Sequence, residues 1–132
     1  DSSVFIAFFN DADVFHKESL VFFEKLLRNK NIINVLPMLV FLEVANVLQK
    51  KIAVFNEKKL LEAFNRYEKV DLSFDSSREY LLLFNHFNLK TSDAIIASCA
   101  KLTNATLVTW DEKLVKEAKK IANVQTPTTF LK

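Results

Sequence analysis

Apolar residues form short runs that alternate with longer stretches in which apolar positions recur every three or four residues. The longer stretches predict amphipathic helices, and the short runs predict strands. The predicted helices cover residues 16–30, 38–52, 56–69, 75–87, 92–102 and 112–122, and the predicted strands cover residues 34–36, 70–73, 106–109 and 124–126. This alternation predicts an α/β fold, in which a parallel sheet has helices on both faces.

Two of the predicted helices carry enough apolar residues to predict how they are buried. The helix at 38–52 has apolar side chains around most of its circumference, so we expect it to be buried on two sides. The helix at 16–30 is amphipathic, and its expected buried face consists of Leu20, Phe23, Leu26 and Leu27. A short apolar segment at 4–9 precedes a polar turn at 10–13.

The length of 132 residues suits one domain with one hydrophobic core. No linker, repeat or low-complexity tract divides the sequence. A parallel sheet of this kind should open with a strand, whereas the sequence starts at Asp1, ahead of a helical segment. We therefore expect a single domain over residues 1–132, with a first strand of several apolar residues missing before Asp1.

The composition excludes several classes of function. The chain has no glycine, which excludes the glycine-rich phosphate loops of the Walker and dinucleotide types. No apolar run approaches the roughly 18 residues that a membrane span needs. The single cysteine, Cys99, cannot form a disulfide within the chain, so we expect a soluble protein of the reducing cytoplasm. Asparagine is expected to take turns with positive φ, at sites such as Asn10, Asn31, Asn88 and Asn104.

Charge and hydropathy leave the binding partners open. The net charge of +2 is too small to identify a nucleic-acid binder, and the paired lysines fit a solvated helix face better than a phosphate-binding patch. The apolar fraction is 50% and includes 13 Phe residues. This is rich for a single core of this size, so we expect a buried homo-oligomer face or a groove for a partner.

Four acidic residues, Asp1, Glu43, Asp93 and Asp111, lie where a strand-like run passes into a helix-like run. In a parallel α/β fold these junctions share one edge of the sheet, where ligands bind. The four carboxylates can therefore converge. Two carboxylates about 5 Å apart repel by roughly 3 kcal/mol at an effective dielectric constant of about 20, so a converged set calls for cations.

A purely structural role is the alternative for each acid taken singly. Asp93 and Asp111 stand where helix-capping acids occur, and capping explains either one equally well. Glu43 lies in the apolar stretch 39–45, so we expect it to be buried, and a lone buried charge requires a partner. Oxygen ligands suit Mg²⁺ or Mn²⁺. Zinc is disfavoured, because the two histidines and the cysteine are far apart in sequence.

The segments around these acids, in their order along the chain, resemble the PIN-domain ribonucleases and, within them, the VapC-like toxins. The segments are residues 1–7, 42–48, 91–97 and 107–111. Each motif is weak alone, but the order and spacing of all four match the family over nearly the whole chain. The resemblance implies a PIN-like three-layer α/β/α sandwich with a central, mostly parallel sheet.

The resemblance also implies a site and an activity. The catalytic and metal-binding residues would be the four acids, and the supporting polar groups would be Ser3, Asn46 and Thr109. The implied activity is endonucleolytic cleavage of RNA that depends on Mg²⁺ or Mn²⁺. Many members of the family are toxins paired with a small antitoxin, and many are homodimers, so we expect both kinds of partner here.

Other functions stay open. The same fold could serve RNA maturation or decay, or it could be a catalytically silent PIN module that only binds a partner. A phosphatase or another Mg²⁺-dependent hydrolase is a further class, although Asp1 is not followed by an acid two residues later. Trp110 could stack on a base, but packing is its expected role.

Overall fold

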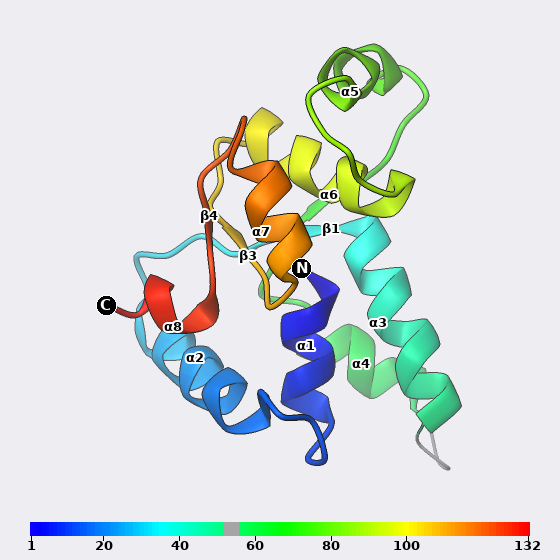
Figure 1. Ribbon diagram of the computed structural model, residues 1–132. Helices are drawn as coiled ribbons and strands as arrows, with labels where there is room; N and C mark the ends of the chain where they lie inside the picture. The colour runs from blue at the N-terminus through cyan, green and yellow to red at the C-terminus, as the bar shows by residue number, and fades with distance from the viewer. Residues whose placement is uncertain (52–55) are drawn as a thin grey trace.

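The computed structural model describes residues 1–51 and 56–132 (Figure 1). Each predicted helix and strand has a counterpart there, although Ile52, at the end of one predicted helix, lies outside the described residues. In chain order the elements are α1 Ser2–Phe9, α2 His16–Arg28, β1 Val35–Pro37, α3 Met38–Lys51, α4 Glu57–Ala63, β2 Glu68–Val70, α5 Ser77–Phe84, α6 Thr91–Leu102, β3 Leu107–Val108, α7 Glu112–Ala118, β4 Val124–Gln125 and α8 Pro127–Phe130.

The strands form two separate parallel pairs. β1 lies parallel to β2, with Leu36 opposite Lys69. β3 lies parallel to β4, with Leu107 opposite Val124. Both pairings are parallel, as predicted. Among the described residues, however, β1 and β3 do not pair with each other, so the sheet consists of two halves.

Two hydrophobic clusters hold the elements together. The larger one joins β1, α3, α6, α7 and the β3–β4 pair, and Val44, Ala97 and Leu114 in it are completely buried. The smaller one joins α1 to α2 through Val4, Phe22, Phe23 and Leu26. Phe5 of α1 packs against both clusters. The helix that begins at Asp1 is therefore anchored on two sides.

Helix α2 buries a different face from the predicted one. Phe23 and Leu26 are buried as expected, but Leu20 and Leu27 are 41% and 60% exposed. Phe22 is buried instead. Its ring packs edge-on against an aromatic ring of α8, a helix that the sequence pattern did not predict. Long-range aromatic packing therefore sets the rotation of α2.

The predicted helix at 56–69 ends early. α4 stops at Ala63, and β2 occupies Glu68–Val70, ahead of most of the strand predicted at 70–73. The backbone N–H of Glu68 donates to the carbonyl of Asn34 at 2.8 Å, so pairing with β1 draws these polar residues out of the helix. Helices α5 and α7 are also shorter than predicted.

Helix α3 is fully buried along one stripe, and half-buried apolar residues beside that stripe, Leu39, Phe41 and Ala45, also pack against the core. Val40, Val44 and Leu48 are buried on successive turns, whereas Leu42 is 51% exposed. α3 contacts α1, β1 and α6. These neighbours leave the face that carries Leu42 open to solvent.

One asparagine takes the positive φ expected for a turn. Asn104, just after α6, has φ 52°, and it is the one non-glycine residue with positive φ in the part of the chain that the structure describes. Asn10 instead ends α1 with φ −112°, an extended conformation that any residue adopts. The expectation of positive φ therefore fails at Asn10, where the turn closes through extended backbone, and also at Asn31 and Asn88.

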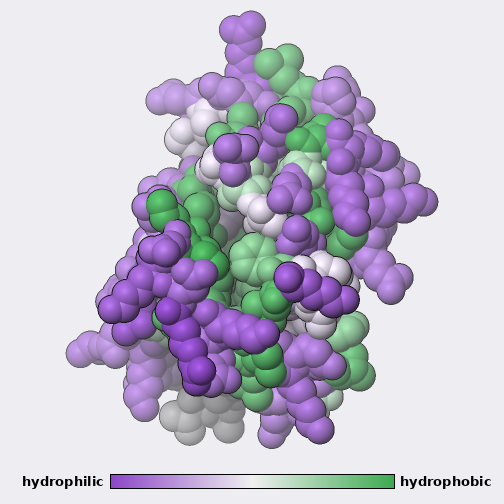
Figure 2. All heavy atoms as spheres, turned by 90° about the vertical axis from the view of Figure 1, so that its left-hand side faces the viewer, coloured by the Kyte–Doolittle hydropathy of each residue, from purple (hydrophilic) through white to green (hydrophobic). Residues whose placement is uncertain are grey.

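Apolar side chains reach the surface between polar ones on the face that carries α2 and α8 (Figure 2). Exposed apolar residues on α2 and in the segments beside it include Val14, Leu20, Val21, Leu27 and Ile33. Part of the apolar excess in the composition therefore lies outside the core. None of the helices in residues 1–51 and 56–132 is long and apolar enough to cross a membrane.

Candidate functional site

Asp1 occupies the N-cap position of α1, and its carboxylate accepts hydrogen bonds from Ser2, Ser3 and Thr109, the one from Ser2 Oγ to Oδ1 being long at 3.4 Å. Oδ2 accepts a hydrogen bond from Ser3 Oγ at 2.7 Å and a longer one from the Ser3 backbone N–H at 3.3 Å. Oδ2 also accepts from Thr109 Oγ1 at 2.8 Å, across 108 positions of sequence. A carboxylate that accepts a backbone N–H at the N-terminus of a helix is stabilised by the helix dipole. Asp1 is thereby fixed in one orientation.

Thr109 is the residue that brings two of the acids together. Its side chain is completely buried at the end of β3. The hydroxyl donates to Asp1 and accepts from the backbone N–H of Asp111 at 3.0 Å. Ser3 adds a parallel link, because its Oγ accepts from the backbone N–H of Trp110 at 3.1 Å. Hydrogen bonds of the Thr109 and Ser3 hydroxyl groups therefore connect the end of β3 to the start of α1.

Asp111 is the N-cap residue of α7, so one of its carboxylate oxygens has the purely structural role of capping a helix. Oδ1 accepts from the backbone N–H of Leu114 at 2.8 Å. A carboxylate has about four lone-pair sites, so a single capping bond leaves acceptor capacity for a cation. The residue is exposed at the mouth of the site.

Asp93 lies in the first turn of α6 but does not occupy its cap position, which belongs to Lys90. Burial raises the pKa of the half-buried Asp93 carboxyl above its ordinary value, and the negative charge of Asp111 raises it further. Lys90 and Lys113 oppose this rise in the pKa. The two acids therefore lie close enough to repel each other, and bound positive charge would relieve that repulsion.

Glu43 is half-buried, not buried as expected. The reason is its place beside the buried stripe of α3, next to the fully buried Val44. The argument that a buried charge demands a partner is therefore weaker than the sequence suggested. Glu43 nevertheless acts electrostatically on the α-amino group of Asp1, so the two residues share one side of the site.

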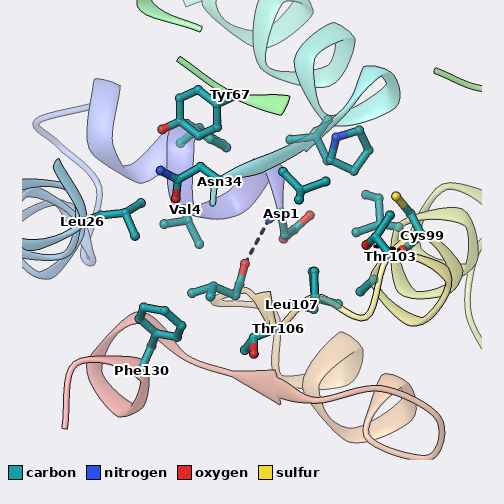
Figure 3. Close-up of a pocket in the computed structure, with 18 of the residues that line it drawn as sticks. Asp1, Val4, Leu26, Asn34, Tyr67, Cys99, Thr103, Thr106, Leu107 and Phe130 are labelled. Atoms are coloured by element: carbon teal, nitrogen blue, oxygen red, sulfur yellow. Dashed lines mark hydrogen bonds between the residues drawn. The ribbon is translucent and has the colours of Figure 1, made fainter. Parts of the chain in front are cut away.

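The α-amino group of Asp1 is buried and donates to the carbonyl of Val108 at 3.0 Å (Figure 3). Burial lowers the pKa of this amine to about 5, while the charge of Glu43 opposes that change. The backbone nitrogen of Asp1 thus sits against β3, and its carboxylate reaches Thr109 one residue later.

The donor set fits a hard divalent cation in its chemistry. All four acids offer oxygen atoms, which Mg²⁺ and Mn²⁺ prefer. The ion pairs within residues 1–51 and 56–132 are Arg28–Glu24 and Lys120–Glu117, so no direct ion pair there neutralises the four acids. Among the four carboxyl groups, Asp111 acts electrostatically on Asp93, and Glu43 acts on the backbone amine of Asp1. No three acidic, histidine or cysteine side chains in the described part of the chain stand in metal-binding geometry as they are.

The predicted supporting residues differ in what they contact. Ser3 and Thr109 bind the Asp1 carboxylate directly. Asn46 is exposed on α3, one turn after Glu43. Trp110 packs, as expected: its indole N–H donates to the buried Ser19 hydroxyl at 2.9 Å.

Sequence reasoning missed two cations and one aromatic partner. Lys90 and Lys113 act on Asp93, and a signal existed, because each lies within three residues of an acid of the set. The ring of Phe15 stacks on Trp110 with centroids 4.4 Å apart and planes 7° apart. Only the folded chain brings that ring to the site.

The PIN domain family profile matches residues 1–120 of the chain. The chain belongs to the PIN domain family. PIN domains are generally nucleases, and PIN nucleases generally use divalent metal ions. The family match thus agrees with the oxygen-rich donor set.

Solved structures share the PIN fold of this chain. A toxin-antitoxin complex from Klebsiella pneumoniae matches with a TM-score of 0.71 and 23% identity, covering 96% of this chain and 94% of that one. VapBC2 from Rickettsia felis, bound to a DNA fragment from its promoter, matches with a TM-score of 0.69 and 23% identity, covering 95% and 94%. No curated protein matches the chain significantly. The predicted PIN-like α/β fold is therefore confirmed.

Proposed function

We propose that this PIN domain is a metal-dependent endoribonuclease and the toxin of a toxin-antitoxin pair. The observation that carries the proposal is the junction at which Thr109 holds the carboxylate of Asp1 beside the backbone of Asp111. The repulsion between the carboxyl groups of Asp93 and Asp111 also supports the proposal. Such an arrangement suits a cation and a phosphodiester.

Asp1, Glu43, Asp93 and Asp111 would hold the cation, Mg²⁺ or Mn²⁺. When bound there, a divalent cation supplies positive charge that activates water and stabilises the charge developing on the phosphate. The chain's own groups orient that site. Ser3 and Thr109 fix the Asp1 carboxylate, and the half-buried setting of Asp93 strengthens its attraction to positive charge.

Lys90 and Lys113 would hold the RNA backbone at this site. Both act electrostatically on Asp93, so they lie at its rim. Lysine is a point-charge ligand for phosphate, and RNA binding of this kind weakens with salt. The net charge of the chain is only +2, so the affinity for RNA would depend on local cations such as these.

The nuclease proposal is tested by cleavage of a structured RNA with Mg²⁺, with Mn²⁺ and with a chelator. Asp93→Asn should lower cleavage at least about 100-fold, because losing a ligand removes several kcal/mol of charge stabilisation. Asp75→Asn, at an exposed acid, is the matched control and should stay active. Full activity of Asp93→Asn, or cleavage by the wild type in chelator, would refute the assignment.

The toxin proposal rests on fold similarity to chains of toxin-antitoxin complexes. Expression of the chain should arrest growth, and co-expression of the neighbouring gene should relieve the arrest through a purifiable complex. Light scattering should give twice the protomer mass of 15.2 kDa for the proposed homodimer. RNA cleavage without growth arrest, and without a partner from the neighbouring gene, would instead indicate RNA maturation or decay.

A further inference from the structure

Two stacked aromatic rings lie beside the acids. The rings of Phe15 and Trp110 are nearly parallel, with planes 7° apart and centroids 4.4 Å apart. Trp110 directly precedes Asp111 in the chain. Its backbone N–H donates to Ser3 Oγ, which in turn donates to the Asp1 carboxylate. The stack therefore begins one residue away from an acid of the candidate site.

The two rings have different surroundings. Trp110 packs against the smaller hydrophobic cluster, and its indole N–H donates to the buried Ser19 hydroxyl. Phe15 belongs to neither cluster and is 40% exposed. Among the described residues, Trp110 is the one aromatic neighbour of Phe15. The indole therefore covers one face of the Phe15 ring, and the exposed part of that ring forms the outer end of the stack.

Hydrogen bonds hold the backbone of Phe15 in place. Phe15 is the N-cap residue of α2, and its backbone N–H donates to Asp13 Oδ1 at 2.9 Å. Its carbonyl accepts from the backbone N–H of Ser19 at 2.9 Å. The next residue, His16, joins this segment to α1, because its Nδ1 lies 2.9 Å from the carbonyl oxygen of Ala7. A ring on a fixed backbone loses little conformational freedom when a ligand binds, which favours its use as a contact.

A flat, exposed ring beside this site suits a nucleobase. Bases stack on aromatic side chains with little dependence on sequence, because each base has a π-face. The charges around Phe15 favour a base over a phosphate group. Residues 11–18 carry one lysine, Lys17, and three acids, Asp11, Asp13 and Glu18. This excess of negative charge repels a phosphate group but does not oppose the uncharged face of a base.

We propose that the ring of Phe15 is a stacking platform for one base of the RNA, in a nucleotide close to the phosphate that meets the acids. The inference rests on the proposed ribonuclease function and deepens it by naming a contact for the bases of the substrate. The base would extend the stack of Trp110 and Phe15 outwards. Binding of this kind tolerates a change of base but not the loss of the base.

The test compares the affinities of two RNA probes by filter binding in chelator, where the proposed nuclease is inactive. One probe is a short oligoadenylate, and the other is an abasic ribose-phosphate oligomer of the same length and charge. The wild type should bind oligoadenylate at least about fivefold more tightly, because the abasic probe has no base to stack.

Substitutions at Phe15 assign this preference to the ring. Phe15→Leu keeps an apolar side chain but removes the ring, so it should lower the affinity for oligoadenylate at least about fivefold and spare the abasic probe. Phe15→Tyr keeps the ring and should bind both probes as the wild type does. Because Phe15 lies outside both hydrophobic clusters, Phe15→Leu should fold, and Tm checks this.

Phe74→Leu is the matched control. Phe74 is 91% exposed and lies just before α5, which Figure 1 shows at the opposite end of the molecule from α2. The substitution makes the same chemical change at an exposed phenylalanine away from the acids. It should leave the affinities for both probes unchanged.

Several outcomes would overturn the proposal. Equal affinity of the wild type for the two probes, or no binding of oligoadenylate, would show that no base is held. An equal loss for both probes in Phe15→Leu would give the ring a purely structural role. A dimer that dissociates in Phe15→Leu while the preference for oligoadenylate persists would place a second copy of the chain on the ring, and not RNA.

The stacking proposal and the nuclease proposal fail in different ways. Cleavage is measured with Mg²⁺ or Mn²⁺, whereas probe binding is measured in chelator. A preference for oligoadenylate that requires Phe15, in a chain that cleaves no RNA, would support stacking and refute the nuclease. Cleavage that requires Asp93, together with unchanged probe binding by Phe15→Leu, would support the nuclease and refute stacking.

Discussion

Replacing the hydroxyl of Thr109 with a methyl group probes the junction of the site directly. Thr109→Val keeps the shape of the buried side chain but removes its hydrogen bonds to Asp1 and Asp111. The Asp1 carboxylate then keeps the bonds from Ser3 and a long one from the Ser2 hydroxyl, at 3.4 Å. The backbone N–H of Asp111 loses its hydroxyl partner.

The size of the effect follows from those two lost bonds. A hydrogen bond to a charged group contributes about 1.5–3 kcal/mol, and a buried donor left without a partner costs about 1–3 kcal/mol. Asp1 is half-buried and keeps three other bonds, so water, Ser2 and Ser3 offset part of the loss. We expect the free energy of unfolding to fall by about 2–4 kcal/mol. Misorientation of Asp1 should weaken Mn²⁺ binding by roughly 10–100-fold.

The assay combines urea denaturation without metal and calorimetric titration with Mn²⁺. Thr109→Ser keeps the hydroxyl and should retain Mn²⁺ binding near the wild-type value. Thr103→Val removes a hydroxyl that donates to the Cys99 carbonyl at 2.8 Å, away from the acids, so it should spare Mn²⁺ binding.

Two results would refute the reasoning. Unchanged stability and Mn²⁺ affinity of Thr109→Val would show that its hydroxyl does not organise the acids. A loss of Mn²⁺ affinity in Thr109→Ser as large as that in Thr109→Val would show that the hydroxyl alone does not hold the acids in place.

Further predictions concern charge and packing. Burial and the charge of Asp111 raise the pKa of Asp93 in the folded protein. Above this raised pKa the ionised carboxyl group destabilises the metal-free protein. As the pH falls through the raised pKa, Asp93 is protonated and the destabilisation disappears. Asp93→Asn should therefore raise Tm at pH 7 without metal and lose that advantage below the unfolded pKa of 3.8; a lower Tm at pH 7 would contradict this. Leu114→Ala, at a completely buried residue, should cost about 2–5 kcal/mol in urea denaturation, and a loss below 1 kcal/mol would contradict the packing. Trp110→Phe should cost about 1–3 kcal/mol, because the buried Ser19 hydroxyl loses its donor, and recovery of that loss in the double variant with Ser19→Ala would support this cause.

Local sequence patterns correctly predicted the helices and strands that do not depend on pairing with a distant segment. The helix at 92–102 and the strand at 106–109 appear almost where expected, as α6 and β3. Pairing over distance decided the misplaced elements. β2 includes the polar residues Glu68 and Lys69, which fit a helix pattern until β1 pairs with them. Helical periodicity carries no information on that partner.

The sequence was enough to propose which acidic residues form the candidate site, but it predicted only part of their contacts and burial. Asp1 and Thr109 are 108 positions apart, and their hydrogen bond exists only because β3 ends against the start of α1. The burial expected for Glu43 failed, because apolar neighbours in sequence need not all face the core. Lys90 and Lys113 gain their role from their position near Asp93 in the folded chain.

Trp110 is an intrinsic fluorescence probe beside the candidate site. It is the single tryptophan of the chain, its backbone N–H binds Ser3, and it precedes Asp111 directly. Its indole is clamped between the ring of Phe15 and the hydroxyl of Ser19. Any ligand that shifts the end of β3 alters the surroundings of this one fluorophore. Unlabelled protein can therefore report events at the acids through its own emission, with no background from a second indole.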